Sequence, residues 1–242
     1  MKEKYLAFNR VDDNTTELYV YGDIRKKNII EKWFGLPTEA TDAFTLKDAL
    51  NAVDTPNLVV RINSYGGSVS EGLAIYSLLS NFKGHVTTVV DGFACSAASI
   101  IFMAGDTRVV PEQGLLMIHN AWSYAEGDSN AMKKMAEDLE KITQPSVNIY
   151  TSKTKLSEEE IKEKMDRETW ITSKEAFEWG FATSIERNDA QQSLECNFVY
   201  NLVMRNKELE AELQFKQEKK EEINAEVEPP KDAWASFFGK EK

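Results

Sequence analysis

Short runs of apolar and β-branched residues alternate with helix-like segments along the first half of the chain. Five runs bounded by polar or turn residues predict strands, at residues 17–24, 57–63, 85–91, 108–111 and 115–119. Residues 69–82 are apolar on nearly every face from Leu73 to Leu79, which predicts a helix between two layers, and the small residues of 94–104 allow a second helix to pack closely. Strands that alternate with helices predict an α/β fold.

The second half of the chain has the spacing of helices. Residues 130–150 are expected to form a long helix, broken or kinked near Pro145 because proline removes a helical hydrogen bond. Its apolar residues recur at helical spacing and are expected to face the core; they are Met132, Met135, Leu139 and Ile142.

Two capping boxes follow this helix. Ser157 with Glu160, and Thr172 with Glu175, have the spacing at which side chains satisfy the free amides of a helix start. They predict two short helices, and Gly180 is expected to end the second.

The character of the chain changes beyond about Asn188. Residues 208–228 are dense in charge and poor in large apolar side chains, which is typical of a solvated helix or a flexible arm. The aromatic cluster at residues 233–239 is either an exposed docking motif or a disordered terminus. We therefore expect one folded domain at residues 1–188 and a charged tail at residues 189–242.

Composition and charge narrow the possible functions. The net charge of −11 excludes the basic surface that nucleic acid requires. Cys95 and Cys196 lack the close pairing of zinc ligands or a disulfide scaffold, so we expect no metal, no cofactor and a reducing, cytoplasmic setting. The first ten residues lack a signal-peptide run, and no stretch of about 18 apolar residues occurs, so neither secretion nor membrane insertion is expected.

Ser96 and His119 are the candidate nucleophile and general base. A serine hydroxyl attacks efficiently only when a base removes its proton. Of the two histidines, His85 begins a predicted strand whereas His119 ends one, where open α/β sheets place functional groups. Without further context, a structural histidine would be an equally good interpretation of His119. Ser96 lies between a strand and a helix, at a helix N-terminus that stabilises negative charge.

Backbone amides near Ser96 could stabilise an oxyanion. The amide of Ala97 directly follows the candidate nucleophile, and Gly67 ends a Gly-Gly pair that lets backbone approach a ligand closely. A strand followed by Gly-Gly and a helix is also typical of phosphate loops and tight turns. Ser64, Ser68 and Ser99 are expected to be structural, and Cys95 to serve packing.

Three motifs in this order resemble the proteolytic subunits of Clp proteases, and especially their phage and prophage relatives. They are residues 61–68 (RINSYGGS), 92–96 (GFACS) and 117–119 (MIH). The resemblance extends over about residues 17–186. It implies a spiral of ββα units, similar to the crotonase fold, in which the long helix after His119 projects as a handle between subunits.

The resemblance also implies a catalytic triad. In this family the serine attacks the peptide carbonyl, the histidine moves the proton, and an aspartate orients the imidazole; Ser96 and His119 match the first two roles. The third position falls on Glu168, with Asp166 as the alternative if the loop is shifted. The chain also departs from the family at Tyr65, where a proline is common.

The expected function is that of a serine endopeptidase in a homo-oligomeric assembly of rings. Phage head maturation, the cutting of scaffold or capsid proteins, is the leading hypothesis; a portal protein is a further potential partner. The alternative is a housekeeping Clp peptidase that works with an ATP-driven (AAA+) unfoldase. An enoyl-CoA hydratase relative and a noncatalytic assembly scaffold are the remaining classes.

Overall fold

The computed structural model describes residues 8–26 and 40–186. The predicted tail at residues 189–242, with its aromatic cluster, lies outside the described residues, as does Cys196. Within the described ranges, no helix is both long and apolar enough to cross a membrane.

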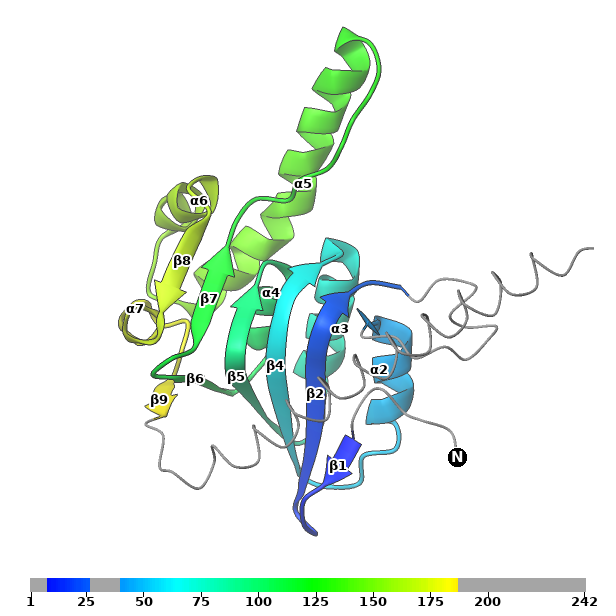
Figure 1. Ribbon diagram of the computed structural model, residues 1–242, viewed down its shortest axis with the longest axis vertical. Coiled ribbons are helices and arrows are strands. Elements are labelled where there is room, and N and C mark those ends of the chain that lie inside the picture. Colours follow the sequence, from blue (N-terminus) through cyan, green and yellow to red (C-terminus); the bar gives the residue numbers. More distant parts are fainter. Residues whose placement is uncertain (1–7, 27–39, 187–242) are drawn as a thin grey trace, which may run out of the picture. The chain divides into compact units, whose positions relative to one another are not determined.

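A single sheet organises the described residues (Figure 1). Its main path runs β1-β2-β4-β5-β6-β9, and all pairs on this path are parallel except β1 with β2. The strands of that path are β1 (Phe8–Arg10), β2 (Thr15–Ile24), β4 (Asn57–Gly67), β5 (His85–Cys95), β6 (Thr107–Pro111) and β9 (Ser184–Glu186). The short β3 (Ala40–Thr41) pairs with β2.

The sheet divides along β5. The first half of β5 pairs with β6, and its last residues, from Phe93 to Cys95, pair with β7 (Leu115–Ile118). The antiparallel β8 (Thr169–Thr172) then extends the sheet beyond β7. This division places the end of β5, which precedes Ser96, beside the end of β7, which precedes His119.

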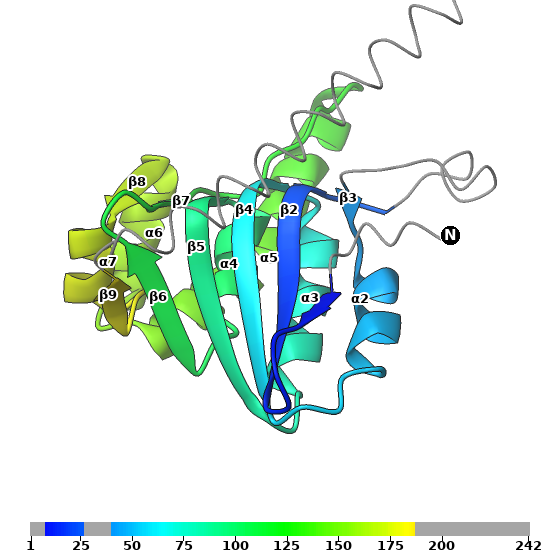
Figure 2. The same ribbon diagram turned by 60° about the horizontal axis from the view of Figure 1, so that its bottom comes forward.

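Six helices accompany the sheet in the part of the chain described. They are α2 (Ala43–Leu50), α3 (Val69–Ser80), α4 (Ala97–Phe102), α5 (Ser129–Lys153), α6 (Glu158–Asp166) and α7 (Ser173–Trp179). Figure 2 shows α3 and α4 together on one face of the sheet. The alternation of strands and helices confirms the predicted α/β fold.

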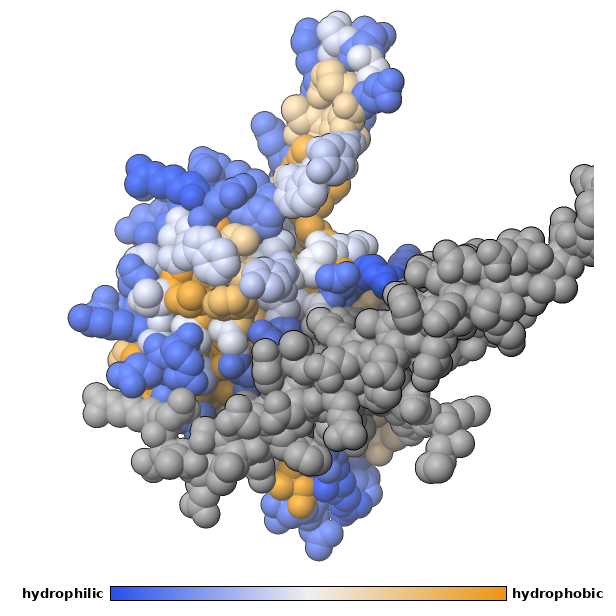
Figure 3. Space-filling model, in the orientation of Figure 1, coloured by the Kyte–Doolittle hydropathy of each residue, from blue (hydrophilic) through white to orange (hydrophobic). Residues whose placement is uncertain are grey.

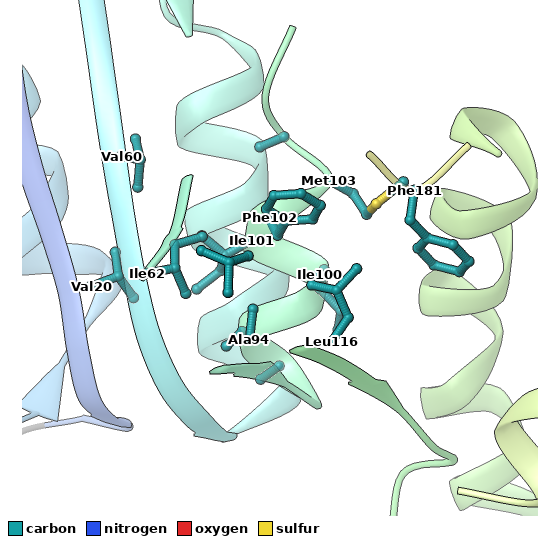
Figure 4. Packing of buried hydrophobic residues seen from close by; sticks show 14 of the residues in the cluster. Val20, Val60, Ile62, Ala94, Ile100, Ile101, Phe102, Met103, Leu116 and Phe181 are labelled. Atoms are coloured by element: carbon teal, nitrogen blue, oxygen red, sulfur yellow. The ribbon is translucent and has the colours of Figure 1, made fainter. Parts of the chain in front are cut away.

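The core forms where α4 packs between the sheet and the later helices. Every residue of this short helix is buried, as its small and apolar sequence predicts. Figure 4 shows Ile100, Ile101 and Phe102 lying between Ile62 of β4 and Phe181. Each fully buried side chain of this size contributes about 1.5–3 kcal/mol to stability, so the residue that precedes α4 stands on a rigid support.

Helix α5 differs from its prediction in two respects. It continues without a break through Pro145. Proline has no N–H to donate to the carbonyl of Lys141, but Lys141 is exposed, so water can solvate that carbonyl. The predicted core-facing stripe is wrong for the outer part of the helix, since Met132 is 37% and Ile142 is 45% exposed. Only the last turns, with Val147 and Tyr150, enter the core, and Figure 3 shows apolar side chains along the projecting part.

Both predicted capping boxes are present. The hydroxyl of Ser157 accepts a hydrogen bond from the amide of Glu160, and Thr172 and Glu175 repeat the arrangement at α7. Gly180 ends α7 with a left-handed φ of 89°.

Candidate active site

Ser96 occupies a sharp turn between β5 and α4. Its backbone has φ 55° and ψ −125°, a conformation that residues with a side chain seldom adopt. The amide of Ser96 donates to the carbonyl of Met117 at 2.8 Å, which ties this turn to the end of β7. The hydroxyl makes no capping hydrogen bond, although Ser96 is the N-cap of α4. The side chain is therefore available for another partner.

Glycine is required on one side of this turn and closely packed on the other. A Cβ atom on Gly66 would lie 2.6 Å from the carbonyl oxygen of Cys95 and 2.7 Å from Cβ of Ser96, and Gly66 also has a φ of 98°. A Cβ atom on Gly72 in α3 would lie 3.0 Å from Cβ of Ala97. Close approach of β4 and α3 therefore fixes the position of Ser96.

His119 is the partner of the Ser96 hydroxyl. It directly follows β7, and its Nε2 atom lies 2.7 Å from Oγ of Ser96. Burial lowers the pKa of the His119 imidazole below its usual range, and the negative charge of Glu168 partly opposes this shift. A neutral imidazole at this distance can accept the serine proton.

The two candidate acids have different environments. His119 directly follows β7, and Glu168 directly precedes β8, whose Thr169 pairs with Ile118. The carboxylate of Glu168 acts on His119 through its charge, and no direct hydrogen bond between the two occurs within the described structure. Asp166 instead accepts a hydrogen bond from Nδ2 of Asn120 at 2.7 Å. The geometry therefore favours Glu168 as the acid that acts on the imidazole.

The backbone of Glu168 is also unusual. Its φ is 48°, and within residues 8–26 and 40–186 the only residues other than glycine with positive φ are Ser96 and Glu168. Backbone strain of this kind costs about 1–3 kcal/mol and concentrates at functional sites. Both strained positions belong to the same predicted triad.

The two predicted oxyanion donors occupy different settings. Ala97 begins α4, where the first amides of a helix have no intrahelical acceptor. The sequence predicts that Gly67 lies in a loop. In the structure it lies in a strand, because β4 continues to pair with β2 through this residue. A Cβ atom on Gly67 would lie 2.3 Å from the carbonyl oxygen of Ile24, whereas Gly66 is the glycine in contact with Ser96.

The other polar side chains near the motifs have structural partners. The hydroxyl of Ser64 donates to the carbonyl of Gly22 at 2.5 Å, and that of Ser68 caps α3. Cys95 is fully buried, and burial raises the pKa of its thiol to about 11. His85 contacts Thr107 at 3.0 Å, at the opposite end of β5 from Ser96. None of these groups competes with Ser96 or His119.

Three aromatic rings lie beside the site. The rings of Tyr65 and Phe93 are 5.4 Å apart, and those of Phe93 and Trp170 are 5.8 Å apart. Tyr65 is 70% and Trp170 48% exposed. Tyr65 directly precedes Gly66, the glycine in contact with Ser96. An accessible aromatic surface therefore adjoins the polar groups.

Sequence reasoning missed two contributors to the site. It gave no separate role to Gly66, the glycine that lies against Ser96, although this glycine was visible in the motif. It also gave no role to Asn120. The only sequence signal for a role of Asn120 was its position next to His119. The partner of Asn120 lies 46 residues away, and only the pairing of β7 with β8 brings them together.

Comparison with known proteins identifies the family of this chain. The family model described as Clp protease matches residues 40–189. An ATP-dependent Clp protease proteolytic subunit from Deinococcus radiodurans is 29% identical over 172 residues, covering 69% of this chain and 83% of the relative. One from Bacteroides fragilis is 28% identical over 178 residues, covering 71% and 85%.

The fold has a counterpart among solved structures. A ClpP1 mutant from Listeria monocytogenes superposes with a TM-score of 0.58 at 21% identity, covering 71% of this chain and 91% of that one. This likeness confirms the ClpP-like α/β architecture that the motifs implied.

Proposed function

Because the chain belongs to the Clp protease family and is a serine-type peptidase, we propose that Ser96, His119 and Glu168 form its catalytic triad. The observation that carries this proposal is the 2.7 Å separation of Ser96 Oγ from His119 Nε2, at a serine with positive φ. Asp166 is the less suitable acid because Asn120 engages its carboxylate.

The proposed reaction is acyl transfer through Ser96. Its Oγ attacks the peptide carbonyl carbon while Nε2 of His119 takes the hydroxyl proton. The negative charge of Glu168 stabilises the imidazolium, which then gives the proton to the leaving amine. The Ala97 and Gly67 amides serve as donors to the oxyanion. A water molecule, deprotonated by His119, releases the acyl group and restores Ser96.

A polypeptide substrate suits the surroundings of the triad. The exposed rings of Tyr65 and Trp170 both contact Phe93, three residues before Ser96, and offer an apolar surface to side chains of an unfolded chain. Aromatic residues of this kind are enriched where proteins bind other chains.

We propose a homo-oligomeric ring, and face-to-face stacking of two rings, as the active assembly. The projecting part of α5 exposes Met132 and Ile142, which a single chain leaves in contact with water. Packing against α5 of a second copy would bury them, and burial contributes about 25 cal/mol per Å².

For the biological role we propose phage head maturation in the bacterial cytoplasm, with scaffold or capsid proteins as substrates. Its support is the resemblance of the three motifs to phage relatives and the charged sequence after Asn188. The names of the curated relatives favour the alternative, a proteolytic subunit of an ATP-dependent protease that works with an unfoldase. Hydrolysis that requires ATP and such a partner would support the alternative.

The test of the site is labelling with a fluorophosphonate, followed by intact-mass measurement and peptide mapping. A single adduct on Ser96, absent from Ser96→Ala, is expected. Ser152→Ala is the matched control, because it removes an exposed hydroxyl on α5 that donates to the carbonyl of Ile149, and it should label like the wild type. An adduct on another residue, or none, would contradict the proposed triad.

A further inference from the structure

Two buried hydroxyl groups connect helix α5 to the peptide group of Ser96. The hydroxyl of Tyr150 lies 2.7 Å from Oγ of Ser99, and Oγ of Ser99 donates to the carbonyl oxygen of Ser96 at 2.7 Å. Ser99 is 1% and Tyr150 2% exposed. A polar chain buried this completely requires every member to be satisfied.

The direction of these hydrogen bonds follows from the number of protons. A serine hydroxyl carries one proton, and that of Ser99 points to the carbonyl of Ser96. Tyr150 must then be the donor to Ser99. Burial raises the pKa of Tyr150, which keeps its phenol protonated and able to donate.

The carbonyl of Ser96 shares a rigid plane with a proposed oxyanion donor. The peptide bond between Ser96 and Ala97 is planar, so the carbonyl of Ser96 and the amide of Ala97 turn together. The amides of Ser99 and Ile100 also donate to this carbonyl, at 2.9 and 3.4 Å, so the hydroxyl of Ser99 adds a third donor. Fixing the carbonyl therefore fixes the direction of the Ala97 amide.

The strained turn needs such support. A positive φ at a residue with a side chain persists only when the surroundings hold it in place. At Ser96 the polar chain from Tyr150 contributes to that restraint from the helix side of the turn, opposite Gly66.

We infer that Ser99 and Tyr150 are positioning residues that hold the Ser96–Ala97 peptide plane so that the Ala97 amide faces the developing oxyanion. The inference rests on the proposed role of Ser96 as nucleophile. On this inference, Tyr150 at the inner end of α5 affects the reaction rate although it touches no reacting atom.

The variant Tyr150→Phe isolates the phenolic hydroxyl. The ring of Tyr150 packs against Phe181 with centroids 5.7 Å apart, and phenylalanine preserves that contact. Ser99→Ala removes the second hydroxyl, and Ser99→Thr restores one. Thr88→Val is the matched control, since the buried hydroxyl of Thr88 donates to the carbonyl of Phe102 at 2.8 Å, at the other end of α4.

The experiment measures kcat and KM on a peptide substrate, together with the rate of fluorophosphonate labelling. Tyr150→Phe and Ser99→Ala are each expected to lower kcat and the labelling rate about tenfold with KM unchanged, because small errors in orientation reduce rates strongly. The double variant should equal Ser99→Ala, since both changes break the same chain. Ser99→Thr should recover most of kcat, and Thr88→Val should retain it.

Three results would overturn the inference. They are unchanged kcat in Tyr150→Phe, an equal loss in Thr88→Val, or a rise in KM at constant kcat. If Ser99→Ala fails to fold, Tyr150→Phe alone decides the question. A wild-type chain that takes no label on Ser96 would instead refute the proposed triad, which separates the two failures.

Discussion

Glu168 and His119 flank the last pair of β7 and β8, because His119 follows Ile118 and Glu168 precedes Thr169, and the charge of Glu168 acts on the His119 imidazole. The left-handed backbone of Glu168 accompanies this placement. Asp166, two residues earlier, lies at the end of α6 and is engaged by Asn120. The hydrogen bond of Asp166 to Asn120 and the charge effect of Glu168 on His119 therefore distinguish two acids that spacing alone could not.

The two acids should respond differently to removal of charge. Glu168→Gln should lower kcat about 100-fold, because the imidazolium formed at His119 loses its stabilising carboxylate. Asp166→Asn should change kcat less than about threefold, since it preserves a hydrogen-bonding side chain beside Asn120. Steady-state kinetics of both variants provide the measurement. The reverse ranking would assign the third role to Asp166.

Two substitutions of Ser96 separate chemistry from strain. Ser96→Ala and Ser96→Gly should each reduce peptide hydrolysis at least about 1,000-fold, because both remove the nucleophile. Glycine adopts φ 55° without steric cost, so Ser96→Gly should have a free energy of unfolding about 1 kcal/mol greater than Ser96→Ala. Denaturant unfolding compares them. Equal stabilities would show that the turn is not strained.

The pH dependence of kcat/KM should report the lowered pKa of His119. The base must be neutral, so activity is lost as the pH falls through this pKa, and burial places that loss below the usual value of about 6.5. Because Glu168 raises the pKa, residual activity in Glu168→Gln should persist to still lower pH. If the acidic loss of activity moved to higher pH in Glu168→Gln, the charge interaction between Glu168 and His119 would be contradicted.

The same titration affects stability. The unfolded chain binds a proton at His119 more readily than the folded chain does, so the contribution of neutral His119 is complete above about pH 6.5 and decreases below it. Replacing His119 by glutamine should remove this part of the acid sensitivity, as unfolding curves at several pH values would show.

The exposed apolar residues of α5 provide a test of assembly. Ile142→Glu should shift the chain to smaller species in analytical ultracentrifugation, because a carboxylate cannot be buried without a partner. Lys141→Gln makes the same change of one charge at an adjacent exposed position and should leave the size distribution unaltered. Identical distributions for both variants would remove α5 from the interface.

Local sequence signals predicted much of the molecule. Alternating patterns located β2, β4 and β5, and capping residues located α6 and α7, because these features depend on neighbours within a few positions. The motifs also selected Ser96 and His119, which the structure brings together.

Long-range contacts set the limits of prediction. Residues 64–67 were interpreted as a loop and residues 94–95 as the start of a helix, but pairing with neighbouring strands keeps both segments extended. The stripe on α5 has the period of a buried helix, and a period does not say whether the core or another copy covers it. Tyr150 gave no signal, because its partner Ser99 lies 51 residues away.

The burial of Cys95 bears on how this peptidase meets oxidants. Peroxide and alkylating reagents attack thiolates, and a thiol with no exposed surface and a pKa raised to about 11 is almost never ionised at neutral pH. The residue next to the proposed nucleophile is thus protected from conversion to a sulfenic acid, and the hydroxyl of Ser96 is itself inert to that chemistry. The turn at Ser96 therefore exposes no thiol to peroxide, in contrast to an active site built on a cysteine nucleophile.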